Sequence, residues 1–479
     1  MTFADIITGK TPADQVSALK TRRYCAPEPK VKDLKNQFNP SGHKIYDITY
    51  RPNKPIYKEI EVGQGLNKKK VKIIDRWEEV NRIALPIQRL IVDRAVSFLF
   101  ANPVVVGCKV ANPDEKKVLE AVKRILFDNK IDAFNRKLAR EVFTYTEAAE
   151  YWYPVEEKEE NGGYGFSTNK RIRVAIFSPG KGDKLYPLFD EHGDMIAFSR
   201  EYKVVDENKK DNIFFETYTD SMILTYKQIE NGWVLIDSKA HTLGKIPIVY
   251  ISQPLAEWAD VQPLIERLEK LLSNFAETND YHASPKIFVN GTIKGFSKKG
   301  EAGGILEAEK DAKAQYLSWD HAPESVKLEI ETLLRLIYSM TQTPDISFES
   351  VKGLGDVSGI ALKLLFMDAH LKGYNKIETF GSAIQRRLNI LKAYVSTMNI
   401  GLKQAARTAV IEPTFSLFMI ENDKEKVEMM YTANGGRPLI SQKEAVRQAA
   451  LSDDPDADYL QIQKEAEEAR TFDVFAFGE

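Results

Sequence analysis

An uninterrupted apolar pattern runs through about forty residues, from Ser358 to Met398. Its apolar side chains recur every three or four positions, which predicts a helix roughly 60 Å long. Gly373 and Gly381 are its expected kink points. A helix apolar on most of its circumference needs more than one covering neighbour, and we expect an interface between subunits to supply much of that cover. The apolar positions are Ile360, Leu364, Leu365, Phe366, Met367, Leu371, Tyr374, Ile377, Phe380 and Ile384.

The stretch GLGDVSG, which ends on Gly359, imitates the glycine-rich loops that hold phosphate groups. A dinucleotide-binding fold needs a second strand after a helix of ordinary length, whereas here a helix of about forty residues follows. A P-loop needs Gly-Lys followed by Ser or Thr, whereas Gly180-Lys181 is followed by Gly182 and Gly244-Lys245 by Ile246. The pattern therefore favours a turn whose glycines supply backbone freedom before Ser358 caps the helix.

Other motifs of catalytic or metal-binding chemistry are incomplete. In PDISFESVK, Glu349 and Lys352 are three positions apart, so a strand would direct them to opposite faces, unlike a nuclease pair. In DPDADYLQIQKE, Tyr459 occupies the position that an EF-hand gives to glycine, which favours aspartates that cap an acidic helix. The six histidines are scattered, and we expect no metal, no cofactor and no enzyme.

Composition describes an ordinary globular chain. The 479 residues suggest roughly two to four domains. The net charge of −2 gives no overall basic field for nucleic acid, and charged residues interrupt the most apolar stretch, which excludes a membrane span. The pattern predicts a hairpin around GQGLNK and helices over 77–102, 114–142, 260–284 (capped by Asp260) and 324–340. It also predicts strands within 143–253, with a hairpin at Asn231-Gly232. Short acidic helices are expected over the last sixty residues.

Five segments, in this order along the chain, carry a resemblance. They are NRIALPIQRLIVDRAVSFLFANPVVV, HTLGKIPIVYISQP, DVQPLIERLEKLLSNFAETNDYHASPKIFVNG, DVSGIALKLLFMDAHLKGYNKIETFGSAIQRRL and PLISQKEAVRQAALSDDPDADYLQIQKEAEEA. Together they span about residues 77–470 and resemble the portal proteins, or head-to-tail connectors, of long-tailed bacteriophages.

The resemblance implies an α+β portal fold with a mixed α/β wing, a helical stem, a small α/β clip, a long kinked helix and a helical C-terminal crown. The expected segments are an N-terminal arm (1–75), wing (76–259), first stem helix (260–284), clip (285–323), second stem helix (324–341), tunnel loop (342–357), long kinked helix with return to the wing (358–420), and crown with C-terminal tail (421–479).

It also implies a function without catalytic residues. About twelve copies would form a ring at the unique vertex of a capsid in the virion, after assembly in the host cytoplasm. Double-stranded DNA would pass through the ring during packaging and ejection. The expected partners are the terminase motor, the major capsid and scaffolding proteins, and the neck or adaptor proteins, with no membrane.

Three groups of residues are expected to meet DNA or partners. The tunnel loop would contribute Lys352, Gly353, Gly355 and Gly359; the clip would contribute Lys286, Lys294, Lys298 and Lys299; and the channel side of the stem would contribute Glu266, Glu269, Lys270 and Glu277. Alternatives stay open: Lys352 pairs with Glu349, the clip lysines keep an exposed loop soluble, and the stem charges form a solvated helix face. The competing function is a DNA-processing enzyme that uses residues 341–358 to bind a nucleotide or metal.

Overall fold

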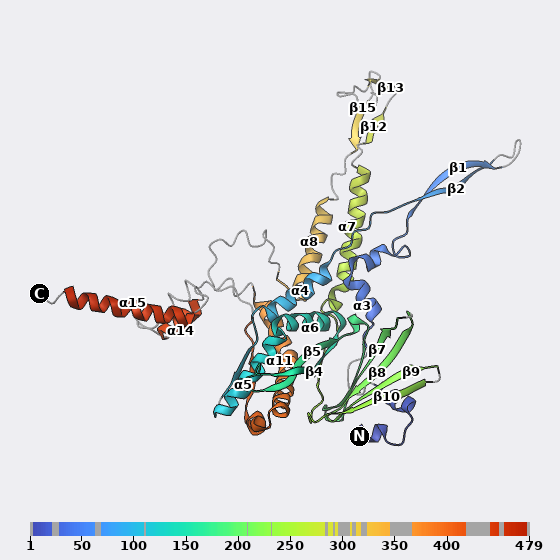
Figure 1. Cartoon of the computed structure of the whole chain (residues 1–479). Coiled ribbons are helices and arrows are strands. Elements are labelled where there is room, and N and C mark those ends of the chain that lie inside the picture. Colours follow the sequence, from blue (N-terminus) through green and yellow to red (C-terminus); the bar gives the residue numbers. More distant parts are fainter. Residues whose placement is uncertain are drawn as a thin grey trace. The chain divides into compact units, whose positions relative to one another are not determined.

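A computed structural model describes residues 3–21, 28–62, 69–109, 112–207, 209–230, 232–282, 286–290, 293–295, 307–308, 313–317, 323–344, 366–417, 441–449 and 455–476 (Figure 1). Contacts divide the chain into two compact units. The first is Met1–Ser347 with Met367–Phe418, and the second is Phe348–Phe366 with Met419–Glu479. Helices and strands are mixed in the first unit, so the predicted α+β class is confirmed.

Short helices and a two-stranded ribbon open the first unit. The helices are α1 (Phe3–Ile7), α2 (Pro12–Leu19) and α3 (Val31–Phe38), followed by the 3-10 turns η1 (Pro40–Gly42) and η2 (Lys44–Tyr46). The ribbon pairs β1 (Lys54–Val62) with β2 (Lys69–Glu78) in antiparallel order. This pairing confirms the hairpin predicted around GQGLNK.

Three helices follow the ribbon: α4 (Ile87–Phe100), α5 (Pro113–Asp128) and α6 (Ile131–Tyr145). The prediction of a helix over 77–102 was wrong at its start. Strand β2 takes the first of those residues, and Pro86 disfavours helical backbone in the residue before it, so the helix begins after the proline. The stretch predicted over 114–142 is two helices, separated where Lys130 adopts a left-handed φ of 48°.

Two antiparallel sheets follow. One has the order β10-β9-β8-β7-β6, with β6 (Lys184–Phe189), β7 (Met195–Val205), β8 (Asp211–Tyr218), β9 (Met222–Ile229) and β10 (Gly232–Ala240). The other has the order β11-β4-β5, with β4 (Glu147–Asn161), β5 (Thr168–Phe177) and β11 (Ile248–Ser252). The hairpin predicted at Asn231-Gly232 joins β9 to β10. Strands β4 and β6 were not predicted; in β4, buried Glu147 and Glu150 break the apolar pattern.

Hydrophobic clusters join the sheets to their surroundings. Ile6, Val16 and Leu19 of α1 and α2 pack with Phe215 and Tyr226 of the five-stranded sheet. A second cluster links the two sheets through Phe177, Phe198, Tyr218 and Ile248. Part of the predicted N-terminal arm is therefore built into the sheet region.

A pair of helices leads to a small group of strands. They are α7 (Gln262–His282), entered through the turn η5 (Ala259–Val261), and α8 (Pro323–Met340), as predicted. Asp260 lies inside η5 and does not cap the helix, because the turn starts after Trp258. Between the helices, β12 (Lys286–Asn290) pairs with β15 (Lys313–Leu317), and β13 (Ile293–Gly295) pairs with β14 (Glu307–Ala308).

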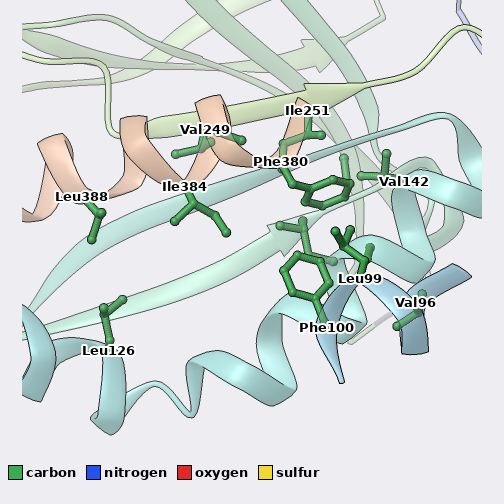
Figure 2. Close-up of a cluster of buried hydrophobic side chains, with 14 of the residues drawn as sticks. Val96, Leu99, Phe100, Leu126, Val142, Val249, Ile251, Phe380, Ile384 and Leu388 are labelled. Carbon is green, nitrogen blue, oxygen red and sulfur yellow. The ribbon is translucent and has the colours of Figure 1, made fainter. Parts of the chain in front are cut away.

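The long helix is α11 (Met367–Met398). Its predicted start at Ser358 lies outside the described residues. The chain continues through η6 (Ile400–Leu402), α12 (Lys403–Thr408) and β16 (Ile411–Thr414), which pairs with β3 (Val105–Cys108). Figure 2 shows Phe380, Ile384 and Leu388 of α11 among side chains of α4, α5, α6 and β11. These contacts form the main hydrophobic core.

The burial of α11 corrects the expectation of an intersubunit cover. Phe380 and Ile384 are 1% and 2% exposed without a second copy. Only the first turns carry an exposed apolar stripe, in which Met367 and Tyr374 are 51% and 61% exposed. The core of the chain, and not a partner, covers most of this helix.

The second unit contains the helices α14 (Gln442–Ala449) and α15 (Pro455–Ala476). Asp456 and Asp458 lie in the first turn of α15, where negative charge is favourable, while the capping position before Pro455 lies outside the described residues. In the part of the chain that is described, no group of side chains is arranged to hold a metal ion. Likewise, no described helix has both the length and the apolarity to cross a membrane.

Candidate functional site

Residues 43–54, here called the strap, cover one face of the stem helix α7. At their start, His43 Nδ1 lies 2.6 Å from Glu269 Oε1, and Nε2 lies 2.8 Å from the carbonyl oxygen of Gln37. Both ring nitrogens face oxygen acceptors, an arrangement that a doubly protonated imidazole satisfies. The Leu85 amide also donates to Glu269 Oε1, at 2.9 Å. Glu269 Oε1 therefore has two partners, the His43 ring and the Leu85 amide.

Glu269 was predicted to line a channel, and in the structure its side chain is buried. The side chains of His43 and Glu269 are both only 2% exposed, so the carboxylate faces the strap and not solvent. Removing either partner would leave the other buried and uncompensated, which is costly. Glu269 is therefore a structural residue that joins the strap to the stem.

The C-terminal end of the strap contacts the C-terminal half of α7 through Arg51 and Lys54. Arg51 Nη1 donates to Asn274 Oδ1 at 2.6 Å, and its Nη2 lies 3.4 Å from Glu277 Oε2. Lys54 Nζ reaches the same Glu277 oxygen at 3.0 Å. Arg51 Nε also donates to the Asn81 carbonyl at 2.8 Å, so the guanidinium links the two ends of the ribbon to the stem.

The remaining stem candidates also meet the strap, but at the surface. Lys44 Nζ lies 3.2 Å from Glu266 Oε2. The ammonium groups of Lys44 and Lys270 lie 4.9 and 5.2 Å from the centre of the Tyr50 ring, within cation–π range. The side chains of Glu266 and Glu277 are 23% and 19% exposed. Glu266, Lys270 and Glu277 each contact a residue of the strap. They are therefore neither unpaired charges nor charges that contact only solvent.

Sequence reasoning missed the strap because its contacts join residues more than two hundred positions apart. Its buried members His43 and Arg51 stand in a stretch rich in lysine and proline that shows no helical or strand period. One signal was present: Ile45, between them, is an aliphatic residue next to Lys44 and is 1% exposed.

Residues Thr341–Pro344, here called the joint, connect α8 to the predicted tunnel loop, which starts at residue 342. Gln342 has a left-handed φ of 50°, which is strained for a residue with a side chain. Arg94 Nη1 donates to the Pro344 carbonyl at 2.8 Å, and the Thr343 amide donates to the Tyr338 carbonyl at 2.9 Å. The exit from α8 therefore has a defined conformation.

A buried carboxylate and two lysines lie beside the joint. Lys372 Nζ lies 2.8 Å from Glu257 Oε2 and donates to the Thr341 carbonyl at 2.9 Å, while Lys376 pairs with the other Glu257 oxygen. Burial raises the pKa of Glu257, but the two lysines outweigh burial and leave that pKa below its usual range. Burial lowers the pKa of Lys372 even though Glu257 opposes the change.

The other predicted site residues cannot be placed in the same detail. Lys352, Gly353, Gly355 and Gly359, together with Lys298 and Lys299, lie outside the described residues. Lys286 begins β12 and Lys294 lies in β13, which puts both on the strands between the stem helices. Contact of these residues with DNA or a partner stays a prediction.

Comparison with known proteins identifies the family. The family model described as "Phage portal protein, SPP1 Gp6-like" matches residues 65–471. The chain therefore belongs to this family of phage portal proteins, which is structural and not enzymatic, and the resemblance seen in the five segments is confirmed. The strap and the helices before it precede the matched residues.

Similar solved structures come from gene transfer agent (GTA) particles. A chain from "Neck of empty GTA particle computed with C6 symmetry" is 10% identical, with 76% of this chain and 89% of that chain covered and a TM-score of 0.41. A chain from "Virion of native gene transfer agent (GTA) particle" is 10% identical, with 76% and 88% covered and a TM-score of 0.38. No curated protein matches the chain in sequence. The assignment rests on the family match.

Proposed function

We propose that the chain forms a closed homo-oligomeric ring at the unique vertex of a phage capsid. The ring is the conduit for DNA during packaging and ejection, and it is the docking platform for the terminase motor and the neck proteins. The family match over residues 65–471 carries this proposal. The helix pair α7 and α8, with strands β12–β15 between them, supports it, because these elements would form the stem and the clip.

The charges of the stem suit a conduit. Duplex DNA carries one negative charge per ~1.7 Å, so a strongly basic channel would bind it too tightly to let it slide. On α7, Arg267 is used in contacts at 2.8 and 2.7 Å with Glu329 of α8, and Glu277 neutralises strap cations. A stem whose charges are already paired offers a sliding polymer few strong attachments.

Exposed apolar side chains mark the surfaces that the ring would cover. On the ribbon, Tyr57 and Trp77 are 57% and 58% exposed, although a two-stranded ribbon is marginally stable alone. On α11, Leu371 is 49% exposed, beside Met367 and Tyr374. Apolar groups of this size on otherwise polar elements favour contact with a neighbouring copy.

Packaging of DNA into capsids of the same virus, with its terminase, tests the conduit directly. Lys352→Ala and the Gly353→Pro/Gly355→Pro variant should both assemble rings, and the proline variant should package less DNA because its loop has lost backbone freedom. Replacing residues 286–323 by a Gly-Ser linker should keep the fold and abolish packaging. Filled particles from the linker variant would contradict the docking role, and normal packaging by the proline variant would contradict the role of the loop.

Hydrolysis provides a second test of the same proposal. Energy for packaging is proposed to come from the separate terminase ATPase, so the purified chain should not hydrolyse ATP with or without DNA. A persistent monomer with ATPase or nuclease activity would instead support the DNA-processing enzyme.

A further inference from the structure

In the sequence, residues 345–365 lie between the joint and α11. The side chain of Lys372 links the joint to α11. Lys372 lies in the second turn of α11, and its ammonium group donates to the carbonyl of Thr341, directly after α8. Its side chain is 12% exposed, and Glu257 beside it is 4% exposed. A charged donor in such a buried place contributes more than an ordinary hydrogen bond.

The joint is held independently at three further points. Thr341 Oγ1 donates to the Ile337 carbonyl at 2.7 Å, and Thr343 Oγ1 donates to the Thr341 carbonyl at 3.2 Å. Arg94 of α4 holds Pro344, and its guanidinium lies 5.3 Å from the centre of the Tyr338 ring. These contacts tie the joint to α4 and α8, while Lys372 alone among the described side chains ties it to α11 by a hydrogen bond.

The left-handed φ of Gln342 indicates that these contacts constrain the backbone of the joint. A left-handed conformation is strained for a residue with a side chain, and it persists only where the surroundings impose it. No glycine stands at this position, although glycine would adopt the same φ without strain. The chain therefore holds its exit from α8 in one direction.

We propose that Lys372 is a positioning residue that locks the joint Thr341–Pro344 to α11, so that the end of α8 and the start of α11, which flank residues 345–365 in the sequence, are held together. The segment contains most of the predicted tunnel loop, and in this respect the inference rests on the proposed function. A force that DNA exerts on the loop would then reach α8 and α11 together. Glu257, which follows β11, fixes the lysine to the sheet region of the same unit.

Hydrogen exchange of the purified full-length chain, followed by mass spectrometry, tests the lock. Lys372→Met keeps an unbranched side chain as far as the Cε position and removes the ammonium donor. We expect exchange of the amides of Thr341, Gln342 and Thr343 to accelerate about tenfold to a hundredfold. Lys372→Arg, which can still donate, should restore most of the protection.

Lys376→Met is the matched control. It removes the second lysine from the same carboxylate, but Lys376 reaches Gln253 and not the joint. Equal acceleration in both lysine variants, or none in Lys372→Met, would overturn the proposal. If Lys372→Met does not fold because Glu257 is left buried with one partner fewer, Lys372→Met combined with Glu257→Gln decides: it should accelerate exchange of the joint, and unchanged exchange would reject the lock.

The packaging assay distinguishes failure of the proposed portal function from failure of the proposed Lys372 lock. With the lock in place as proposed, Lys372→Met should form rings and package less DNA than Lys376→Met. If the unmodified chain forms no rings, the proposed function fails while the exchange result still decides on the lock. If rings of Lys372→Met package normally although exchange of the joint accelerates, the claim that force reaches both helices through this lysine is wrong.

Discussion

Truncation of Phe380 distinguishes a core helix from an interface helix. Its ring is 1% exposed and meets Phe100 and Phe143 edge to face, with centroids 5.4 and 5.7 Å apart. Phe380→Ala removes a buried aromatic side chain and leaves a cavity, which costs about 4 kcal/mol. If the region opens as one unit, that cost corresponds to about a 10³-fold increase in the open population.

Native-state hydrogen exchange measures this change locally, which avoids assuming two-state unfolding of a chain of 479 residues. Peptides from α4, α6 and the middle of α11 should lose protection in Phe380→Ala. Tyr374→Ala on the same helix, where the ring is 61% exposed, should leave the core protected and weaken only ring assembly. Unchanged protection in Phe380→Ala together with loss of rings would refute the argument and restore the interface interpretation.

Three further changes probe buried contacts. Arg387 donates to both oxygens of Glu150, at 2.9 and 2.5 Å, so Arg387→Met should destabilise the fold by about 3–5 kcal/mol in denaturant unfolding, and adding Glu150→Leu should recover part of the loss. A Cβ at Gly373 would lie 2.9 Å from the side chain of Leu417, so Gly373→Ala should cost about 1–3 kcal/mol and Leu417→Ala should reduce that penalty. The pKa of Glu257 is lower folded than unfolded, so its contribution is present above its usual 4.5 and is lost as pH falls through the lower folded pKa; Glu257→Gln should flatten that part of a stability–pH profile.

Local pattern was enough to predict much of the fold. Helix α8 and the ribbon follow from apolar period and turn residues, and the acidic opening of α15 follows from its aspartates. The predicted element boundaries were wrong where a single residue interrupts an apolar pattern. Pro86 precedes the start of α4, and Lys130 separates α5 from α6. Such boundaries depend on backbone geometry that apolar periodicity does not report.

The candidate site was harder to predict because its contacts join distant segments. Glu269 looked like a solvated helix charge until the structure placed His43 against it. Glu257 and Lys372 stand 115 positions apart and show no motif. Charged residues on a helix have the same sequence signature whether they face solvent, DNA or a buried partner, so only the fold separates these cases.

Imaging of the purified full-length chain tests the central claim most directly. Negative-stain or cryogenic electron microscopy, with mass photometry of the same sample, should show closed rings with a central channel and a mass near that of about twelve subunits of 54.4 kDa. Particles that remain monomeric at the concentrations used for assembly, or that associate into open filaments without a channel, would contradict the assignment of a conduit.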